Sequence, residues 1–266
     1  MTDIRDILHD LRAEGASLDA LVAELEAEAW RGATPADGWT IAHQIAHLAW
    51  TDEVSLLALT EPDRFPELVA QALDRAEKGT SLVDEAAEEG TAEAPHQLLQ
   101  RWRSDRERLL ETLGNTDPHT RVPWFGTSMR ATSMATARIM ETWAHGQDVA
   151  DALGVTRSPT SRLRHVAHLG VRTRDFAYAA HGLQPPPDPF RIELRAPDNT
   201  LWTWGPEDAE QRVTADALDF CLLVTQRRHR NDLTLTATGP DAQHWLTIAQ
   251  AFAGPPGAGR APEVTT

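Results

Sequence analysis

A proline-rich segment divides this chain into two parts with different hydrophobic patterns. Residues 184–189 have the sequence QPPPDP, which is stiff and cannot continue a helix. Before this segment, apolar residues recur every three or four positions, as they do on one face of an amphipathic helix. After it, stretches such as residues 190–194 (FRIEL) alternate apolar and polar residues, as strands do. The sequence therefore predicts a two-domain α+β protein, with an all-helical domain followed by a small domain that mixes strands and helices.

The two patterns also predict where the individual elements lie. Helical periodicity is expected over residues 3–30, 40–60, 65–89, 98–113, 131–153 and 160–180. Residues 114–130 are expected to be a long loop that carries aromatic side chains. Strands are expected at 190–194, 201–204, 211–214 and 233–237, and helices at 215–228 and 241–251. The expected domains are residues 1–183 (helical bundle) and 184–254 (α+β), followed by a flexible tail at 255–266.

The overall charge and the cysteine count exclude several classes of protein. The 266 residues include 40 acidic and 25 basic side chains, for a formal net charge of −15. We therefore expect neither nucleic-acid binding nor binding to an anionic membrane, since both need a basic surface. The single cysteine excludes an intramolecular disulfide and a cysteine-rich zinc site. Because no membrane span or signal peptide is evident, we expect a cytoplasmic protein.

A carboxylate and an imidazole are placed for metal binding in the fifth expected helix. Glu141 and His145 are four residues apart, so they project from the same face of a helix about one turn apart. Both side chains can reach one divalent cation. The same spacing also fits a solvated pair, so a third ligand from another helix has to decide between the two interpretations.

The second expected helix offers that third ligand. His47 lies in the apolar stretch IAHLA (residues 45–49), where an unpaired imidazole is costly, and His43 is one turn away. Helical bundles build metal sites from side chains on facing helices. Two histidines and one carboxylate would form a three-ligand site that leaves positions open for water or substrate. The alternative is a buried histidine that is hydrogen-bonded to a neighbouring carbonyl group.

Two segments carry a family resemblance. Residues 38–49 (GWTIAHQIAHLA) and 141–148 (ETWAHGQD) resemble the mycothiol-dependent maleylpyruvate isomerase family, part of the wider DinB-like group of metal-binding four-helix bundles. The resemblance implies a DinB-like bundle followed by a small α+β domain like that of sterol carrier proteins. It also implies a divalent metal, zinc, bound by His47, Glu141 and His145. An arginine of the C-terminal domain serves the active site in that family, and Arg227 and Arg228 are the candidates here.

These features together favour a metal-dependent enzyme. With mycothiol or another low-molecular-weight thiol as cosubstrate, it would isomerise a small electrophilic substrate or transfer the thiol to it. The alternatives are a metal-assisted hydrolase and a metal- or ligand-binding protein without turnover. The expected partners are the small-molecule substrate and the thiol, and the chain is expected to be a monomer or a homodimer.

Several other polar residues have two interpretations. Asp148 either orients a ligand histidine or is solvated. His165, His168, Arg172 and Arg174 either line a pocket for an anion or form a solvated helix face, which we favour. Arg227 and Arg228 are also placed to complement the dipole at a helix C-terminus. Cys221 lies among apolar residues, so we expect it in a core rather than as a nucleophile.

Overall fold

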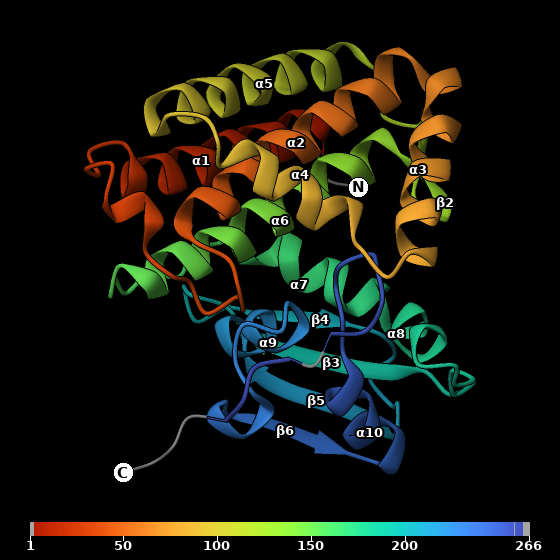
Figure 1. The fold of residues 1–266 in the computed structure, drawn as a ribbon. Helices are drawn as coiled ribbons and strands as arrows, with labels where there is room; N and C mark the ends of the chain where they lie inside the picture. The colour runs from red at the N-terminus through yellow and green to blue at the C-terminus, as the bar shows by residue number, and fades with distance from the viewer. Residues whose placement is uncertain (1–2, 258, 263–266) are drawn as a thin grey trace. The chain divides into compact units, whose positions relative to one another are not determined.

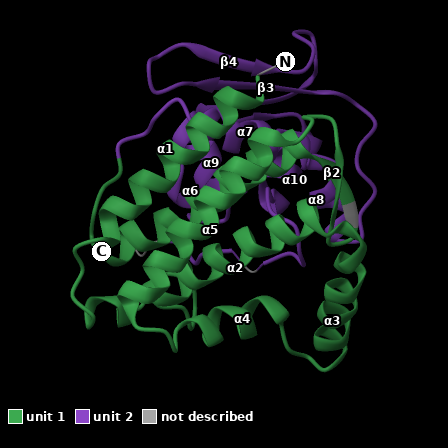
Figure 2. Cartoon of the chain, turned by 90° about the horizontal axis from the view of Figure 1, so that it is seen from above, with its two compact units in different colours: residues 1–157 green, residues 158–266 purple. Residues whose placement is uncertain are grey.

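The structure is a computed structural model that describes residues 3–257 and 259–262. The chain forms two compact units, residues 1–157 and residues 158–266, which Figure 2 distinguishes by colour. The first unit is helical apart from one short hairpin, and the second combines a four-stranded sheet with short helices. This confirms the mixed α+β class with a helical N-terminal region. Among the described residues, no helix combines the length and the apolar character that crossing a bilayer requires.

Four long helices make the frame of the first unit (Figure 1). They are α1 (Ile4–Val22), α2 (Ile41–Thr60), α5 (Pro95–Asn115) and α6 (Ala131–Ala152). Helix α2 packs against α5 and α6, and α1 packs against the same two helices. Each helix places apolar residues toward the others at helical spacing, which is why the sequence pattern located all four.

Shorter elements interrupt two of the helices that the sequence predicted. The first ends at Val22 and is followed by a separate turn, η1 (Ala29–Arg31). After η2 (Pro62–Arg64), the segment expected as one helix forms α3 (Phe65–Glu77) and α4 (Leu82–Gly90). Gly79 has a φ of 75° between them, a left-handed conformation that helix interiors exclude. Ser81 then caps α4 by accepting a hydrogen bond from the Asp84 amide at 3.2 Å.

A hairpin occupies the C-terminal part of the loop expected at residues 114–130. Strands β1 (Arg121–Trp124) and β2 (Thr127–Arg130) pair antiparallel, and Gly126 has a φ of 72° at the turn between them. Val122 in β1 is buried in the core of the unit. The loop prediction was therefore wrong, because a buried position and a turn glycine hold two strands of only four residues.

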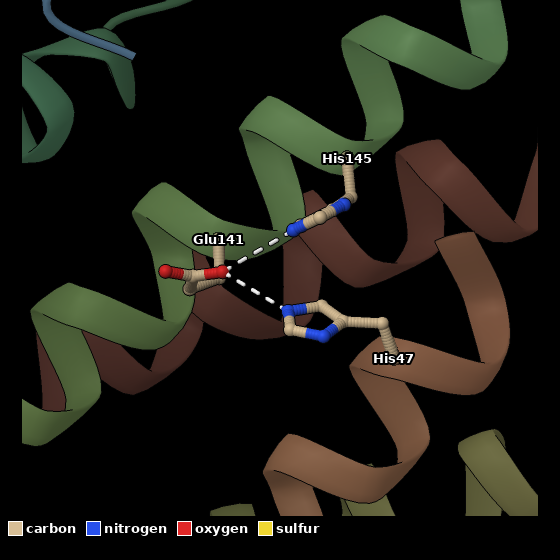
Figure 3. A group of neighbouring side chains, drawn as sticks. All are labelled: His47, Glu141 and His145. Atoms are coloured by element: carbon tan, nitrogen blue, oxygen red, sulfur yellow. Dashed lines mark hydrogen bonds and ion pairs between the residues drawn. The ribbon is translucent and has the colours of Figure 1, made fainter. Parts of the chain in front are cut away.

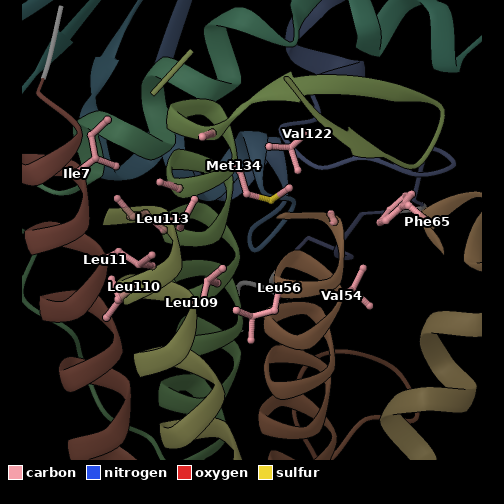
Figure 4. Close-up of a cluster of buried hydrophobic side chains, with 14 residues drawn as sticks. Ile7, Leu11, Val54, Leu56, Phe65, Leu109, Leu110, Leu113, Val122 and Met134 are labelled. Atoms are coloured by element: carbon pink, nitrogen blue, oxygen red, sulfur yellow. The ribbon is translucent and has the colours of Figure 1, made fainter. Parts of the chain in front are cut away.

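One hydrophobic core cluster joins the hairpin and α3 to the four long helices (Figure 4). Its buried members are Ile7, Leu11, Val54, Leu56, Ala58, Phe65, Leu109, Leu110, Leu113, Val122, Ala131, Met134, Ala135 and Ile139. A second cluster includes Leu18, Ile45, Leu48, Trp102 and Val149, and draws on the same four helices. Apolar burial along the length of the frame therefore fixes the helices against one another.

A buried ion cluster ties α2, α5 and α6 together. The carboxylate of Asp52, which is fully buried, accepts hydrogen bonds from Arg106 Nε at 2.7 Å and from Arg138 Nε at 3.0 Å. Arg106 also donates to Thr142 Oγ1 at 2.9 Å, and Arg138 donates to Thr51 Oγ1 at 2.7 Å. Each charge therefore has a partner of opposite charge in a region without solvent, as buried ions require.

The second unit is built on a four-stranded sheet. Its strands are β3 (Phe190–Arg195), β4 (Leu201–Trp204), β5 (Gln211–Asp216) and β6 (Leu235–Thr238), in the order β4-β3-β5-β6. Strands β3 and β5 are parallel, and the other neighbours are antiparallel. The helices are α7 (Leu163–Arg172), α8 (Arg174–Ala180), α9 (Ala217–Val224) and α10 (Pro240–Ile248), with a turn η3 (Arg230–Asp232). All four strands lie where the alternating pattern predicted them, within two residues.

Helices α7 and α8 belong to the second compact unit. Helix α7 packs against α9, and α8 packs against α10. The domain boundary expected after residue 183 follows both helices, whereas the boundary between the compact units precedes them. The single helix expected at 160–180 is divided at Thr173, which lies between α7 and α8.

Candidate metal centre

The structure brings together the three side chains that the sequence singled out as metal ligands. His47 lies on α2, and Glu141 and His145 lie one turn apart on α6 (Figure 3). One donor atom from each residue lies within 4.8 Å of the donors of the other two. Both histidine side chains are nearly buried, and 21% of the Glu141 side chain is exposed. The packing of α2 against α6 therefore creates a three-donor cluster at the position that the motifs predicted.

The distances within this cluster fit a shared cation better than direct hydrogen bonds. Glu141 Oε2 lies 3.4 Å from His47 Nε2 and 3.3 Å from His145 Nε2. A good N–H···O hydrogen bond spans about 2.7–3.2 Å. By contrast, two donors that each lie about 2.0–2.1 Å from a tetrahedral ion are separated by roughly 3.3–3.4 Å. The donor set of two imidazoles and one carboxylate therefore fits a zinc-like divalent ion in both chemistry and spacing.

The surroundings of Glu141 favour its charged form. Burial alone raises the pKa of this carboxyl group, but the His145 and His47 rings, which donate to it and carry positive charge when protonated, outweigh burial. The pKa of Glu141 therefore lies well below its usual value of 4.5. A carboxylate held in its anionic form is ready to bind a cation.

Trp39 and Gln44 surround the cluster, and sequence reasoning assigned a role to neither. The Trp39 ring lies 5.4 Å from the His47 ring and 6.0 Å from the His145 ring, measured between centroids. Gln44 is fully buried, and its Oε1 lies 2.5 Å from His145 Nδ1. The signal for Gln44 was a polar residue on the apolar side of α2, three positions after Ile41.

His43 does not join the donor cluster, although its position one turn before His47 left that open. Its Nδ1 accepts a hydrogen bond from the Thr40 amide at 3.2 Å, and its Nε2 lies 2.8 Å from Glu88 Oε2. The ring therefore closes the first turn of α2 and links that helix to α4.

The other polar candidates of the first unit and of α7 and α8 are now placed. Asp148 is buried, so its interpretation as a solvated residue was wrong. The group expected on the sixth helix is divided: His165, His168 and Arg172 lie on α7, whereas Arg174 lies on α8, with its guanidinium carbon 4.5 Å from the centre of the Phe190 ring. His168 is exposed and its Nδ1 accepts a hydrogen bond from Trp204 Nε1 at 3.1 Å.

The remaining candidates lie on or after α9. Cys221 is fully buried, and burial raises its pKa far above the usual value, so the thiol is a core group, as expected. Arg227 and Arg228 follow the end of α9 at Val224 rather than belonging to it, because Gln226 has a φ of 58°. Their guanidinium groups donate to the carbonyl oxygens of Thr225 and Arg227, at 2.6 and 2.8 Å. A role for either arginine in catalysis stays a prediction.

Comparison with protein families gives two matches. The family model for the mycothiol maleylpyruvate isomerase N-terminal domain matches residues 11–150, which include all three donors of the cluster. A model described as wyosine base formation matches residues 186–238 of the second unit.

Individual proteins are similar over nearly the whole chain. Two Mycobacterium tuberculosis proteins, the uncharacterized proteins MT0041 (strain CDC 1551 / Oshkosh) and Rv0036c (strain H37Rv), are each 57% identical over 260 residues, which is 98% of this chain and 100% of theirs. The crystal structure of the mycothiol-dependent maleylpyruvate isomerase superimposes with a TM-score of 0.58 at 17% identity, covering 89% of this chain and 93% of that one. A histidine-to-alanine mutant of that enzyme gives 0.59 at 16% identity, covering 88% and 93%. At such low identity, these two structures show a shared fold.

Proposed function

This chain belongs to the mycothiol maleylpyruvate isomerase N-terminal domain family, and from that premise we propose that it is a metal-dependent enzyme of thiol chemistry. It uses a low-molecular-weight thiol, such as mycothiol, to isomerise a small electrophilic substrate or to transfer the thiol to it. The observation that carries this proposal is the convergence of His47, Glu141 and His145, inside the segment that the family model matches. On this proposal the first unit is a DinB-like bundle, and the second is like a sterol carrier protein.

The donor set supports a catalytic ion rather than a structural one. A structural zinc ion is closed by four protein ligands, whereas three ligands leave room for an exogenous group. Zinc suits two imidazoles and a carboxylate, although other divalent metals accept the same donors. When bound, such an ion supplies positive charge that lowers the pKa of a thiol beside it and so favours the thiolate.

The residues of the chain supply the rest of the site. Glu141 contributes the negative charge of the donor set, and both histidines present Nε2 toward it. The Trp39 ring packs against both imidazoles and limits how far either can turn. Cys221, the only cysteine of the chain, is buried, so the nucleophilic sulfur has to come from a separate molecule.

Isomerisation needs no net reagent when a thiol is present. The thiolate adds to an activated cis double bond, the resulting single bond rotates, and elimination of the same thiolate forms the trans product. Electrons and atoms balance, and the thiol is regenerated. We propose that Arg227 or Arg228 binds an anionic group of the substrate, because a guanidinium matches the two oxygens of a carboxylate.

Metal analysis and turnover assays test the proposal. Protein purified without chelator is expected to contain one equivalent of divalent metal, and His47→Ala is expected to lose it. His43→Ala is the matched control, because His43 lies on the same helix but bonds Thr40 and Glu88 instead. Less than one equivalent in the wild type, or full metal content in His47→Ala, would overturn the metal site.

The reaction is tested separately with maleylpyruvate as the electrophile. Turnover is expected with mycothiol present and is expected to vanish when mycothiol is omitted. Equal turnover without any thiol, to a product formed by addition of water and cleavage of a bond, would identify a hydrolase. Absence of turnover under both conditions would indicate a binding protein.

A further inference from the structure

A line of hydrogen bonds connects the loop before α2 to one of the histidines of the cluster. The loop is closed by a bridge between Ala33 and Thr40. Inside it, the Thr34 hydroxyl group donates to the Trp39 carbonyl oxygen at 2.8 Å. Gln44 Nε2 donates to Thr34 Oγ1 at 2.9 Å, and Gln44 Oε1 lies 2.5 Å from His145 Nδ1.

The Trp39 carbonyl oxygen determines which atom is the donor in each of these hydrogen bonds. A carbonyl oxygen can only accept, so the Thr34 hydroxyl proton lies between Thr34 Oγ1 and the Trp39 oxygen. Without that proton, two oxygen atoms would face each other at 2.8 Å and repel. Thr34 Oγ1 can then only accept from Gln44, which must present its NH2 group to Thr34. The carbonyl end of the Gln44 amide therefore faces His145.

This orientation fixes the tautomer of His145. Because Gln44 Oε1 can only accept, the proton of the His145 ring lies on Nδ1. In the neutral ring, Nε2 is then unprotonated, and Nε2 is the atom that lies 3.3 Å from Glu141 Oε2 in the donor cluster. A histidine binds a cation through its unprotonated nitrogen, and the hydrogen bond on the other nitrogen selects which one that is.

The two histidines of the cluster differ in the hydrogen bonding of Nδ1. Within the described part of the chain, Nδ1 of His47 is buried and has no hydrogen-bond partner. The His47 ring is held by packing, with the His145 ring 4.4 Å and the Trp39 ring 5.4 Å away. Hydrogen bonding outside the donor set therefore acts on the cluster through His145.

We propose that Gln44, oriented by Thr34, is a positioning residue that holds His145 as the Nδ1–H tautomer and so presents Nε2 to a divalent cation. This inference rests on the proposed metal site. It predicts that Gln44 affects the metal affinity of His47, Glu141 and His145 although Gln44 is not itself a ligand.

Three substitutions separate positioning from packing. Gln44→Leu keeps a side chain of similar size and removes both polar contacts. Gln44→Glu retains an oxygen for His145 whichever way the carboxylate turns, and loses the hydrogen bond that Gln44 donates to Thr34 Oγ1. Gln147→Leu is the matched control, because Gln147 is a buried glutamine on α6 that donates to Asp151 Oδ1 at 2.9 Å.

The first measurement is the dissociation constant for Zn²⁺, obtained by competition with a chelator. We expect Gln44→Leu to weaken binding about 10–100-fold, the range found for lost second-sphere hydrogen bonds. Gln44→Glu is expected to restore affinity to within a few-fold of the wild type, and Gln147→Leu is expected to leave it unchanged. Wild-type affinity in Gln44→Leu would overturn the inference. If Gln44→Leu does not fold, Thr34→Val releases the amide and is expected to weaken binding in the same direction.

The second measurement needs no metal. In ¹H–¹⁵N spectra of the metal-free wild type with a neutral His145 ring, Nδ1 is expected to carry the proton. In Gln44→Leu, we expect a mixture of both tautomers. The Nε2–H tautomer in the wild type would overturn the inference. A wild type that binds no Zn²⁺ but shows the Nδ1–H tautomer would support the hydrogen-bond line and overturn the proposed function instead.

Discussion

Replacing Asp52 by asparagine tests how much the buried ion cluster stabilises the helical unit. Asp52 is fully buried, and the side chains of Arg106 and Arg138 are only 7% and 2% exposed. Asp52→Asn keeps the shape of the side chain but removes its charge and replaces one acceptor oxygen with a donor. Both guanidinium groups would then lose the carboxylate that they share.

The expected cost follows from burial. Burial lowers the pKa of Arg106, and the charge of Asp52 acts in the opposite direction, so the carboxylate offsets the desolvation of the guanidinium. Removing one partner of a buried pair typically costs about 3–5 kcal/mol. For a unit of this size, each kcal/mol lowers the midpoint of thermal unfolding by roughly 2–4 °C. We therefore expect Asp52→Asn to lower the midpoint by about 6–20 °C.

Thermal unfolding of the full chain, followed by far-ultraviolet circular dichroism, measures this effect. Glu107→Gln is the control, because Glu107 accepts two hydrogen bonds from Arg12, at 2.7 and 3.0 Å, in a pair whose side chains are 58% and 60% exposed. An exposed pair contributes about 0–1 kcal/mol. If Asp52→Asn lowers the midpoint of thermal unfolding no more than Glu107→Gln does, burial does not determine how much the ion cluster stabilises the unit, and the reasoning is refuted.

Three further substitutions test other parts of the structure. In metal-free protein, the free energy of unfolding lost in Glu141→Gln should shrink as the pH falls from about 4.5 through the lowered pKa of Glu141, because the histidines stabilise its charged form. Urea unfolding across this range measures it. His43→Ala should cost about 0.5–2 kcal/mol in thermal unfolding, by loss of the cap of α2, with unchanged metal content. Gly205→Ala would press a Cβ atom against the Phe190 carbonyl oxygen, and Gly205 also has a φ of 79°. It should therefore lower the free energy of unfolding more than Gly154→Ala, which adds only backbone strain of about 1–2 kcal/mol; equal midpoints of thermal unfolding for the two variants would refute this.

Long periodic segments made most of the fold predictable from the sequence. Helices α2, α5 and α6 and the four strands of the second unit begin and end within a few residues of their expected positions. The hairpin of β1 and β2 was missed because its strands are too short to show a period of their own. The assignment of α7 and α8 to the second compact unit was missed for another reason: helical periodicity reveals that a helix has an apolar face, but not which element covers it.

The donor cluster was predictable because histidine and glutamate are recognisable in the sequence as metal-binding residue types. His47, Glu141 and His145 lie close together as expected. His47 stood out in the sequence because burying an unpaired imidazole in an apolar helix face is costly. His43 has the same side chain and nearly the same position, yet its ring points to Glu88 on α4. Gln44 was overlooked because an amide carries no charge, and its importance depends on a contact 101 positions along the chain.

The composition of the donor cluster also affects the order in which this protein can assemble. His47 and Glu141 are 94 positions apart, whereas Glu141 and His145 are separated by one turn of a single helix. During synthesis, about half of the chain has to be completed before the cluster can form. Closing so long a segment costs entropy that is recovered only when α2 and α6 pack together. On the proposed metal site, loading would be a late step of folding, and an ion bound by both α2 and α6 would slow unfolding because it connects two helices that are distant in the sequence.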